Sequence, residues 1–180
     1  MLPLPLKAKS MDQLFSFECK SLIAKSREVA IKLGYDYIST IHIFLADCET
    51  DYPTSVKKFA FDNEDAYIKF KKDYTLPEVN YLDNINDSLP LTVEAESAIR
   101  LALSEMKATG FTKTYPFHIL LGCLKAEHSM LAECFKADKD VVENLMQYYR
   151  DSGTFEQETK PQTDTRRPNW GKSVLKIFRK

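Results

Sequence analysis

The chain repeats itself, and this duplication limits the folds that it can adopt. When the sequence is shifted by 76 positions, identical residues coincide without a gap from Ser21 to Asp62. The matched pairs are Ser21/Ser97, Ile23/Ile99, Gly34/Gly110, His42/His118, Ile43/Ile119, Leu45/Leu121, Phe59/Phe135 and Asp62/Asp138. A constant offset is what duplication of one folding unit leaves behind. We therefore predict two similar lobes that share a core.

The first helix of each half is marked by its ends. Ser16 and Thr92 stand where a helix cap is expected, and Gly34 and Gly110 close the apolar, helix-spaced segments that follow. Ser and Thr are favoured at helix N-termini and Gly at helix C-termini. The pattern predicts one long helix at the start of each repeat.

The second helices, predicted over 41–48 and 117–125, are apolar on several faces and should form the buried centre of each lobe. Two shorter amphipathic segments follow in each half, marked by Val56, Phe59, Phe61, Ala66, Ile68 and Phe70, and by Leu131, Phe135, Val141, Val142, Leu145 and Met146. No segment shows the sustained alternation typical of strands. The prediction is an all-α fold of about eight helices with pseudo-two-fold symmetry.

The domain boundaries follow from this pattern. Residues 1–14 form an N-terminal extension, and 15–150 form one domain of two repeats, 15–74 and 91–150, joined by a connector over 75–90. The tail, 151–180, contains seven Lys or Arg and four Asp or Glu and is rich in Thr and Gln. Such a composition predicts a flexible, basic segment.

The composition excludes some classes of protein. The net charge is −1, so no overall positive field favours nucleic acid. The four cysteines have no CxxC spacing and are expected to be small core side chains in a reducing compartment. The N-terminus is a poor signal peptide, and the apolar stretches are too short to cross a bilayer. We predict a cytoplasmic protein without membrane insertion.

The same order of elements occurs twice in the chain: a long helix, a Gly, a loop with aromatic residues and a helix that starts Thr/Pro-x-His-Ile. The sequences are LGYDYISTIHIFLADC and TGFTKTYPFHILLGCL, preceded by SLIAKSREVAIKLG and SAIRLALSEMKATG. This ordered set resembles the Clp N-terminal domain, the double Clp repeat at the front of Clp-type AAA+ unfoldases. The resemblance covers roughly Phe15 to Tyr149.

The resemblance implies a module without catalytic activity or cofactors. Family members bind adaptors and substrates and deliver them to an ATPase ring. The expected partners are Clp ATPase or protease subunits, adaptors or substrates, and not nucleic acid. Two settings fit, a stand-alone adaptor or regulator and the front module of a longer unfoldase; the Met start and the basic ending favour the first.

One departure from the family pattern bears on the ligand. Members of the ClpC type that bind phosphorylated arginine carry a Glu directly before the shared His. Here these positions are Ile41 and Phe117, which can neither accept a hydrogen bond nor neutralise a cation. We therefore predict protein or peptide recognition rather than phosphoarginine binding.

The candidate partner-binding residues lie around the loops before the second helices. They are Tyr37, Ile41, Tyr115 and Phe117. They either pack the loops onto the core or line an apolar groove, because aromatic anchors are favoured in interfaces. The caps Ser16 and Thr92 are candidate anion-attracting positions, since helix N-termini attract anions.

Catalytic and metal sites are not predicted. The three histidines and four cysteines form no recognised zinc spacing. Gly171–Ser173 reads GKS, but Arg166 stands where a phosphate loop needs Gly.

Two alternatives remain open. The chain could be a small helical enzyme or ligand-binding protein that uses the same scaffold. It could instead bind nucleic acid or a membrane surface through its basic tail.

Overall fold

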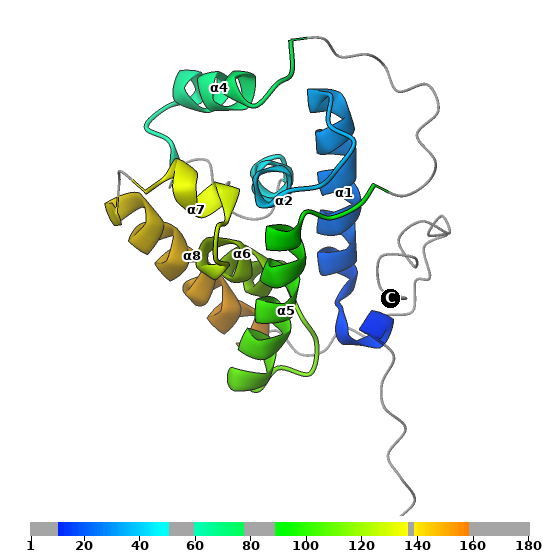
Figure 1. Cartoon of the computed structure of the whole chain (residues 1–180). Helices are drawn as coiled ribbons and strands as arrows, with labels where there is room; N and C mark the ends of the chain where they lie inside the picture. The colour runs from blue at the N-terminus through cyan, green and yellow to red at the C-terminus, as the bar shows by residue number, and fades with distance from the viewer. Residues whose placement is uncertain (1–10, 51–59, 78–88, 137–138, 159–180) are drawn as a thin grey trace, which may run out of the picture.

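A computed structural model describes residues 11–50, 60–77, 89–136 and 139–158. In these ranges the chain forms a short 3₁₀ helix, η1 (Met11–Leu14), and seven α-helices, with no strand longer than a single bridge (Figure 1). The α-helices are α1 (Phe17–Leu33), α2 (Thr40–Cys48), α4 (Glu64–Asp73), α5 (Val93–Ala108), α6 (Pro116–Lys125), α7 (Met130–Cys134) and α8 (Lys139–Glu158). The all-α prediction is confirmed.

The predicted ends of the first helices are also confirmed. The Ser16 hydroxyl accepts the N–H of Cys19 at 3.1 Å, and the Thr92 hydroxyl accepts the N–H of Ala95 at 3.4 Å. Gly34 and Gly110 have φ of 91° and 77°, in the left-handed region that glycine tolerates. The repeated sequence signals therefore fold into repeated caps.

Two equivalent exchanges of backbone hydrogen bonds show the pseudo-two-fold symmetry. Phe15 of repeat one forms a parallel bridge with Thr114 of repeat two, and Leu91 of repeat two forms one with Ile38 of repeat one. The bonds match as well: Ser16 N–H donates to Thr114 O, and Thr92 N–H donates to Ile38 O, each at 2.9 Å. The entry segment of each repeat is thus held by the loop of the other.

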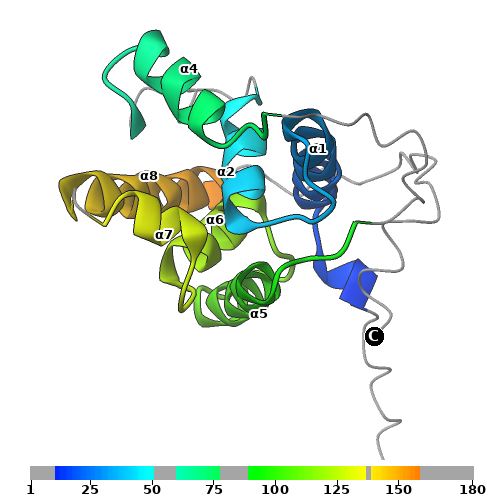
Figure 2. The same ribbon diagram turned by 45° about the horizontal axis from the view of Figure 1, so that its top comes forward.

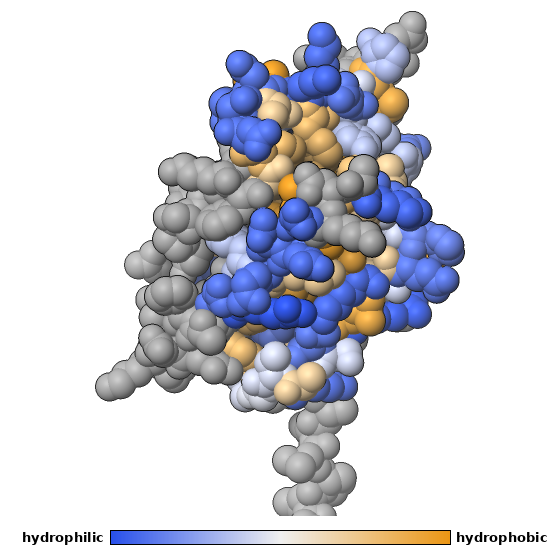
Figure 3. Space-filling view, turned by 90° about the vertical axis from the view of Figure 1, so that its left-hand side faces the viewer, coloured by the Kyte–Doolittle hydropathy of each residue, from blue (hydrophilic) through white to orange (hydrophobic). Residues whose placement is uncertain are grey.

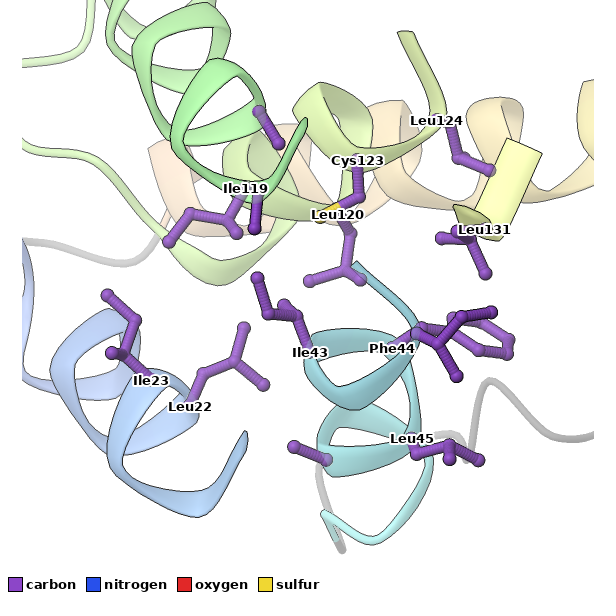
Figure 4. Packing of buried hydrophobic residues seen from close by; sticks show 14 of the residues in the cluster. Leu22, Ile23, Ile43, Phe44, Leu45, Ile119, Leu120, Cys123, Leu124 and Leu131 are labelled. Carbon is purple, nitrogen blue, oxygen red and sulfur yellow. The ribbon is translucent and has the colours of Figure 1, made fainter. Parts of the chain in front are cut away.

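The core lies between the second helices, which are surrounded by the others (Figures 1 and 2). Side chains of α1, α2, α6 and α7 converge there, with Ile43 and Leu120 at the centre of the group (Figure 4). Gly122 brings α6 against α5 so closely that a Cβ there would lie 2.2 Å from Ala98 O. As predicted, both second helices are buried almost throughout.

The fourth helices differ between the repeats. In repeat two, α8 packs through buried Leu145 and Tyr149. Helix α4 lies at the edge of the molecule (Figure 2) and is held there by contacts between aromatic rings. Phe70 stacks on Phe135 of repeat two at 5.8 Å and meets Phe44 of α2 edge-on at 6.3 Å. Aromatic side chains therefore fill the space between α4 and the core.

Ile68, grouped with the packed residues of its segment, is instead 55% exposed, because α4 turns Tyr67, Phe70 and Tyr74 inward. Helix α8 continues past the predicted boundary at 150 to Glu158. Residues 1–10 of the predicted extension, the segment around Val56 and Phe59, residues 78–88 in the middle of the predicted connector and the tail from 159 lie outside the described residues. No described helix is long and apolar enough to cross a membrane.

Candidate functional site: the loops before the second helices

A histidine fixes the start of each second helix. His42 Nδ1 accepts the backbone N–H of Ser39 at 3.0 Å, and His118 Nδ1 accepts that of Tyr115 at 3.0 Å. Each histidine stands at the third position of its helix, where Glu often reaches back to the capping residue. The repeated His therefore closes the loop onto the helix.

Both histidines are held in the neutral form. Burial lowers the pKa of His42 and that of His118 to about 4. Because Nδ1 accepts a hydrogen bond in each ring, the ring proton lies on Nε2. In His118 that nitrogen is 3.3 Å from Thr109 Oγ1. These bonds make the histidines structural parts of the loops rather than exposed bases.

Aromatic rings surround each histidine. In repeat one, Tyr35 and Tyr37 lie 4.7 and 6.1 Å from the His42 ring. In repeat two the ring of His118 lies 5.0 Å from Phe111, 6.3 Å from Tyr115 and 3.9 Å from Phe117. Each repeat thus carries one aromatic–histidine cluster at the same place in its fold.

The four candidate partner-binding residues divide into two kinds. Ile41 is 1% exposed and Phe117 is 6% exposed, so both side chains belong to the core. Tyr37 and Tyr115 are half-buried and present part of their rings at the surface. Of the four candidates, the two tyrosines are therefore the ones that a partner can reach in this conformation.

The two cap residues sit in unequal surroundings. Ser16 is buried, whereas Thr92 is partly exposed and its hydroxyl also donates to Glu94 Oε1 at 2.9 Å. A carboxylate beside the cap repels anions, so Thr92 is a poor place to bind one. The anion-attracting role of these caps stays a prediction.

Glu94 is a site residue that sequence reasoning missed. Its Oε1 accepts the N–H of Thr40 at 3.2 Å, so a side chain of repeat two caps helix α2 of repeat one. Its other oxygen is buried and has no hydrogen-bond partner in the described structure. The equivalent of Thr40 is Pro116, which has no N–H, and the equivalent of Glu94 is Glu18, which is exposed. The difference between Thr40 and Pro116 is the sequence signal that could have indicated that only α2 needs such a cap.

Thr40 also joins α2 to α7. Its Oγ1 accepts the N–H of Leu131 at 3.1 Å and lies 3.2 Å from the Ser129 hydroxyl. Thr40 and Ser129 are almost completely buried. Buried polar networks of this kind hold elements in one arrangement, since each lost partner leaves an unsatisfied group.

A half-buried acid links α2 to α8. The Tyr149 hydroxyl donates to Asp47 Oδ2 at 2.8 Å. Burial raises the pKa of Asp47 to about 6, although the hydrogen bond from Tyr149 acts in the opposite direction. Burial raises the pKa of the Cys123 thiol, and the nearby carboxylates of Glu94 and Asp47 raise this pKa further.

The described residues offer no group of three metal-ligating side chains. Cys19, Cys48 and Cys123 are buried, and Cys134 is half-buried with its Sγ 2.6 Å from the Tyr74 hydroxyl. Burial raises the pKa of the Cys19 and Cys134 thiols. Protonated thiols are poor nucleophiles and poor metal ligands.

Comparison with known proteins identifies the family to which this architecture belongs. The family model of the Clp repeat N-terminal domain matches residues 14–138. No curated protein matches the chain by sequence.

Of the solved structures that resemble the chain, two have a TM-score of 0.62 over 83% of this chain and 99% of the other. One is the N-terminal domain of the chaperone ClpD from Arabidopsis thaliana, 15% identical; the other, 20% identical, comes from a study of a malarial protein secretion system. At these identities the likeness shows the fold. The family match, which spans most of the chain, shows that the protein belongs to the Clp repeat N-terminal domain family.

Proposed function

We propose that this chain is a non-catalytic recognition module of a Clp chaperone or protease system, which docks adaptors, substrates or Clp subunits. Family membership supports this proposal most directly, because Clp N-terminal domains bind substrates and adaptors of Clp chaperones. The paired clusters at equivalent loops give the module two similar places for contact. Tyr37 and Tyr115 are the side chains through which these loops would touch a partner.

The ligand we propose is a protein or peptide surface rather than phosphoarginine. A phosphoarginine site needs an acceptor for the guanidinium group and donors for the phosphate. Ile41 and Phe117 supply no acceptor, and both are buried. At the start of α2 the Thr40 N–H already binds Glu94, and α6 begins with a proline. In both repeats, therefore, the acceptor for the guanidinium group is missing and the backbone donors for the phosphate are reduced.

The test is affinity capture from a lysate of the source organism, with recovered Clp subunits, adaptors and known Clp substrates quantified by mass spectrometry. Wild type is compared with Tyr37→Ala, Tyr115→Ala and the double variant. We expect wild type to enrich Clp components and the double variant to lose most of that enrichment. Phe117→Glu is unsuitable, because a buried charge would unfold the lobe.

Glu18→Gln is the matched control, since Glu18 is exposed and lies at the start of α1. Capture of no Clp component by any folded variant would contradict the proposal. Titration with free phosphoarginine, followed by NMR, is expected to leave the amides of α2 and α6 unchanged. Saturable binding of one or two equivalents would overturn the choice of ligand.

A further inference from the structure

The three inward aromatic side chains of helix α4 have the spacing of a helical ligand. Tyr67, Phe70 and Tyr74 stand at positions i, i+3 and i+7, which fall on one side of a helix. Tyr67 is buried, and Phe70 and Tyr74 pack partly buried against the core. Amphipathic helices that dock on other proteins are anchored through this same spacing. The chain therefore carries a segment with the form of a bound helical peptide.

The surface beneath α4 comes from both repeats. Phe70 stacks on Phe135, directly after α7, at 5.8 Å and meets Phe44 of α2 edge-on at 6.3 Å. The Tyr74 hydroxyl lies 2.6 Å from Cys134 Sγ on α7. Phe44 stands on the side of α2 that faces away from α1 (Figure 4). We call Phe44, Cys134 and Phe135 the α4-binding surface.

Contacts that do not involve α4 hold this surface together. Thr40 Oγ1 on α2 accepts the N–H of Leu131 on α7 at 3.1 Å. The rings of Phe44 and Phe135 meet edge-on at 5.8 Å. A surface that is fixed in advance loses less conformational entropy when a helix binds to it. The α4-binding surface is therefore built to receive a helix.

Helix α4 is packed less deeply than the corresponding helix of repeat two. All 10 residues of α4 are described, and among them only Tyr67 is buried. Helix α8 has 20 residues and buries Leu145 and Tyr149. Apolar surface stays visible between charged side chains at the top of the molecule, where α4 lies (Figure 3). Because so short a helix is marginal without support, α4 is released at a lower cost than α8.

One ion pair sets the charge that the surface selects. Lys71 of α4 pairs with the carboxylate of Glu49 at the end of α2, whereas Lys25 binds the backbone carbonyl of Glu49. The other charged side chains of α4 are exposed and of both signs: Glu64, Asp65, Lys69, Lys72 and Asp73. They select no partner charge. The surface therefore favours one cation, four positions after the first aromatic anchor.

We propose that the α4-binding surface docks an amphipathic helix of a partner protein, which displaces α4. That helix presents aromatic side chains at i, i+3 and i+7, with Lys or Arg at i+4. The argument for this occupant is α4 itself, because it shows which helix the surface accepts. In the isolated chain α4 then acts as a built-in competitor. The inference rests on the proposed recognition function and adds a surface distinct from Tyr37 and Tyr115.

The probe is a synthetic peptide of residues 60–77, added to the full chain labelled with ¹⁵N. It includes Phe61, whose ring lies 6.2 Å from that of Phe135. Affinity is measured by fluorescence anisotropy of the labelled peptide, and the site is mapped by amide shifts. We expect saturable binding with shifts at Phe44, Cys134 and Phe135. A second peptide, which keeps only the three anchors and Lys71, should also bind, and Lys71→Glu in it should weaken binding.

One substitution should have opposite effects in the two molecules. In the chain, Phe70→Ala weakens the competitor, so the unchanged peptide should bind at least tenfold more tightly, because a larger fraction of the chain is open to it. In the peptide, Phe70→Ala should weaken binding at least tenfold.

Two further substitutions guard this comparison. Tyr74→Phe removes only the hydroxyl beside Cys134 and should act in the same two directions with a smaller effect, which keeps the test valid if Phe70→Ala prevents folding. Ile68→Ala is the matched control, since it makes the same gain in helix propensity at an exposed position of α4. It should change either affinity by less than about twofold.

Failure of the peptide to bind both the wild type and the Phe70→Ala chain would overturn this inference. An affinity that Phe70→Ala in the chain leaves unchanged would overturn it too, because α4 would not be a competitor. Exchange of α4 between two copies, seen as self-association without peptide binding, would replace the partner helix by a second copy and refute the proposal. Each of these results leaves Clp capture through the tyrosines standing. Absence of Clp capture with intact peptide binding would refute only the proposed function.

Discussion

Acid should destabilise this domain through the two histidines that close the loops. His42 and His118 are 2% and 0% exposed, and each accepts a backbone N–H through Nδ1. Protonation of Nδ1 would place its new N–H against the backbone N–H that it now accepts, and it would put a charge on a buried ring. In the unfolded chain both rings bind protons at an ordinary pKa, so the unfolded state gains protons first as the pH falls.

The size of the effect follows from the pKa values. The pKa of each ring falls from 6.5 to about 4 on folding, which corresponds to about 3 kcal/mol per histidine. This stability is complete above pH 6.5 and is lost as the pH falls towards 4. Asp47 acts in the opposite direction, since its pKa rises on folding to about 6. Its contribution, about 2 kcal/mol at its partial burial, is present at low pH and lost as the pH rises through 6.

The assay measures the free energy of unfolding in urea, followed by circular dichroism, at a series of pH values between 7.5 and 4.5. Wild type should lose a few kcal/mol over this range, because two histidines outweigh one aspartate. His118→Asn keeps an acceptor near the Nδ1 position without a titrating ring, so its stability should fall less steeply with pH. His128→Asn is the matched control: His128 has φ of 57°, which Asn tolerates, and its ring is exposed.

NMR titration of the ring protons checks the same point directly. His42 and His118 should remain neutral at pH 5.5 in the folded protein. An unfolding free energy that is flat from pH 7.5 to 4.5, or equal pH slopes for wild type and His118→Asn, would refute this reasoning.

Three further predictions concern packing and the thiols. Gly122→Ala should destabilise the fold by more than about 3 kcal/mol in urea unfolding, because its Cβ would meet Ala98 O at 2.2 Å. Gly110→Ala, at φ 77° with open space around it, should cost about 1 kcal/mol. Similar costs for the two substitutions would contradict the close packing of α5 and α6. Thr40→Val should cost about 1–3 kcal/mol by leaving the Leu131 N–H without its acceptor, and a neutral effect would argue against the link between α2 and α7. Under native conditions a thiol reagent should modify Cys134 first, because Cys19, Cys48 and Cys123 are buried; rapid reaction of all four would mean that the core opens easily.

The sequence predicted the scaffold well because its signals are local and occur twice. The caps Ser16 and Thr92, the glycines that end the helices and the apolar second helices each depend on neighbours a few residues away. The pairing of entry segments between repeats was not foreseen, because hydrogen bonds such as that from Ser16 to Thr114 join residues far apart in sequence. Periodicity gives no information on such contacts.

The candidate site was harder to predict for the same reason. The difference of Ile41 and Phe117 from a family pattern makes them candidates, but their burial depends on how the lobes pack. Glu94 caps a helix of the other repeat, which no spacing within its own segment indicates. The exposed position of Ile68 depends on the aromatic rings that turn α4, and these rings include Phe135 of the second repeat.

The central claim is that this Clp repeat domain binds protein partners without catalysis. The most direct measurement is isothermal titration of the purified chain with the purified Clp subunit or substrate that it captures most strongly. The account predicts a saturable complex that Tyr37→Ala with Tyr115→Ala weakens at least tenfold, with the partner's covalent structure unchanged by mass spectrometry. Absence of a complex between the purified proteins, or chemical conversion of the partner by the chain alone, would contradict it.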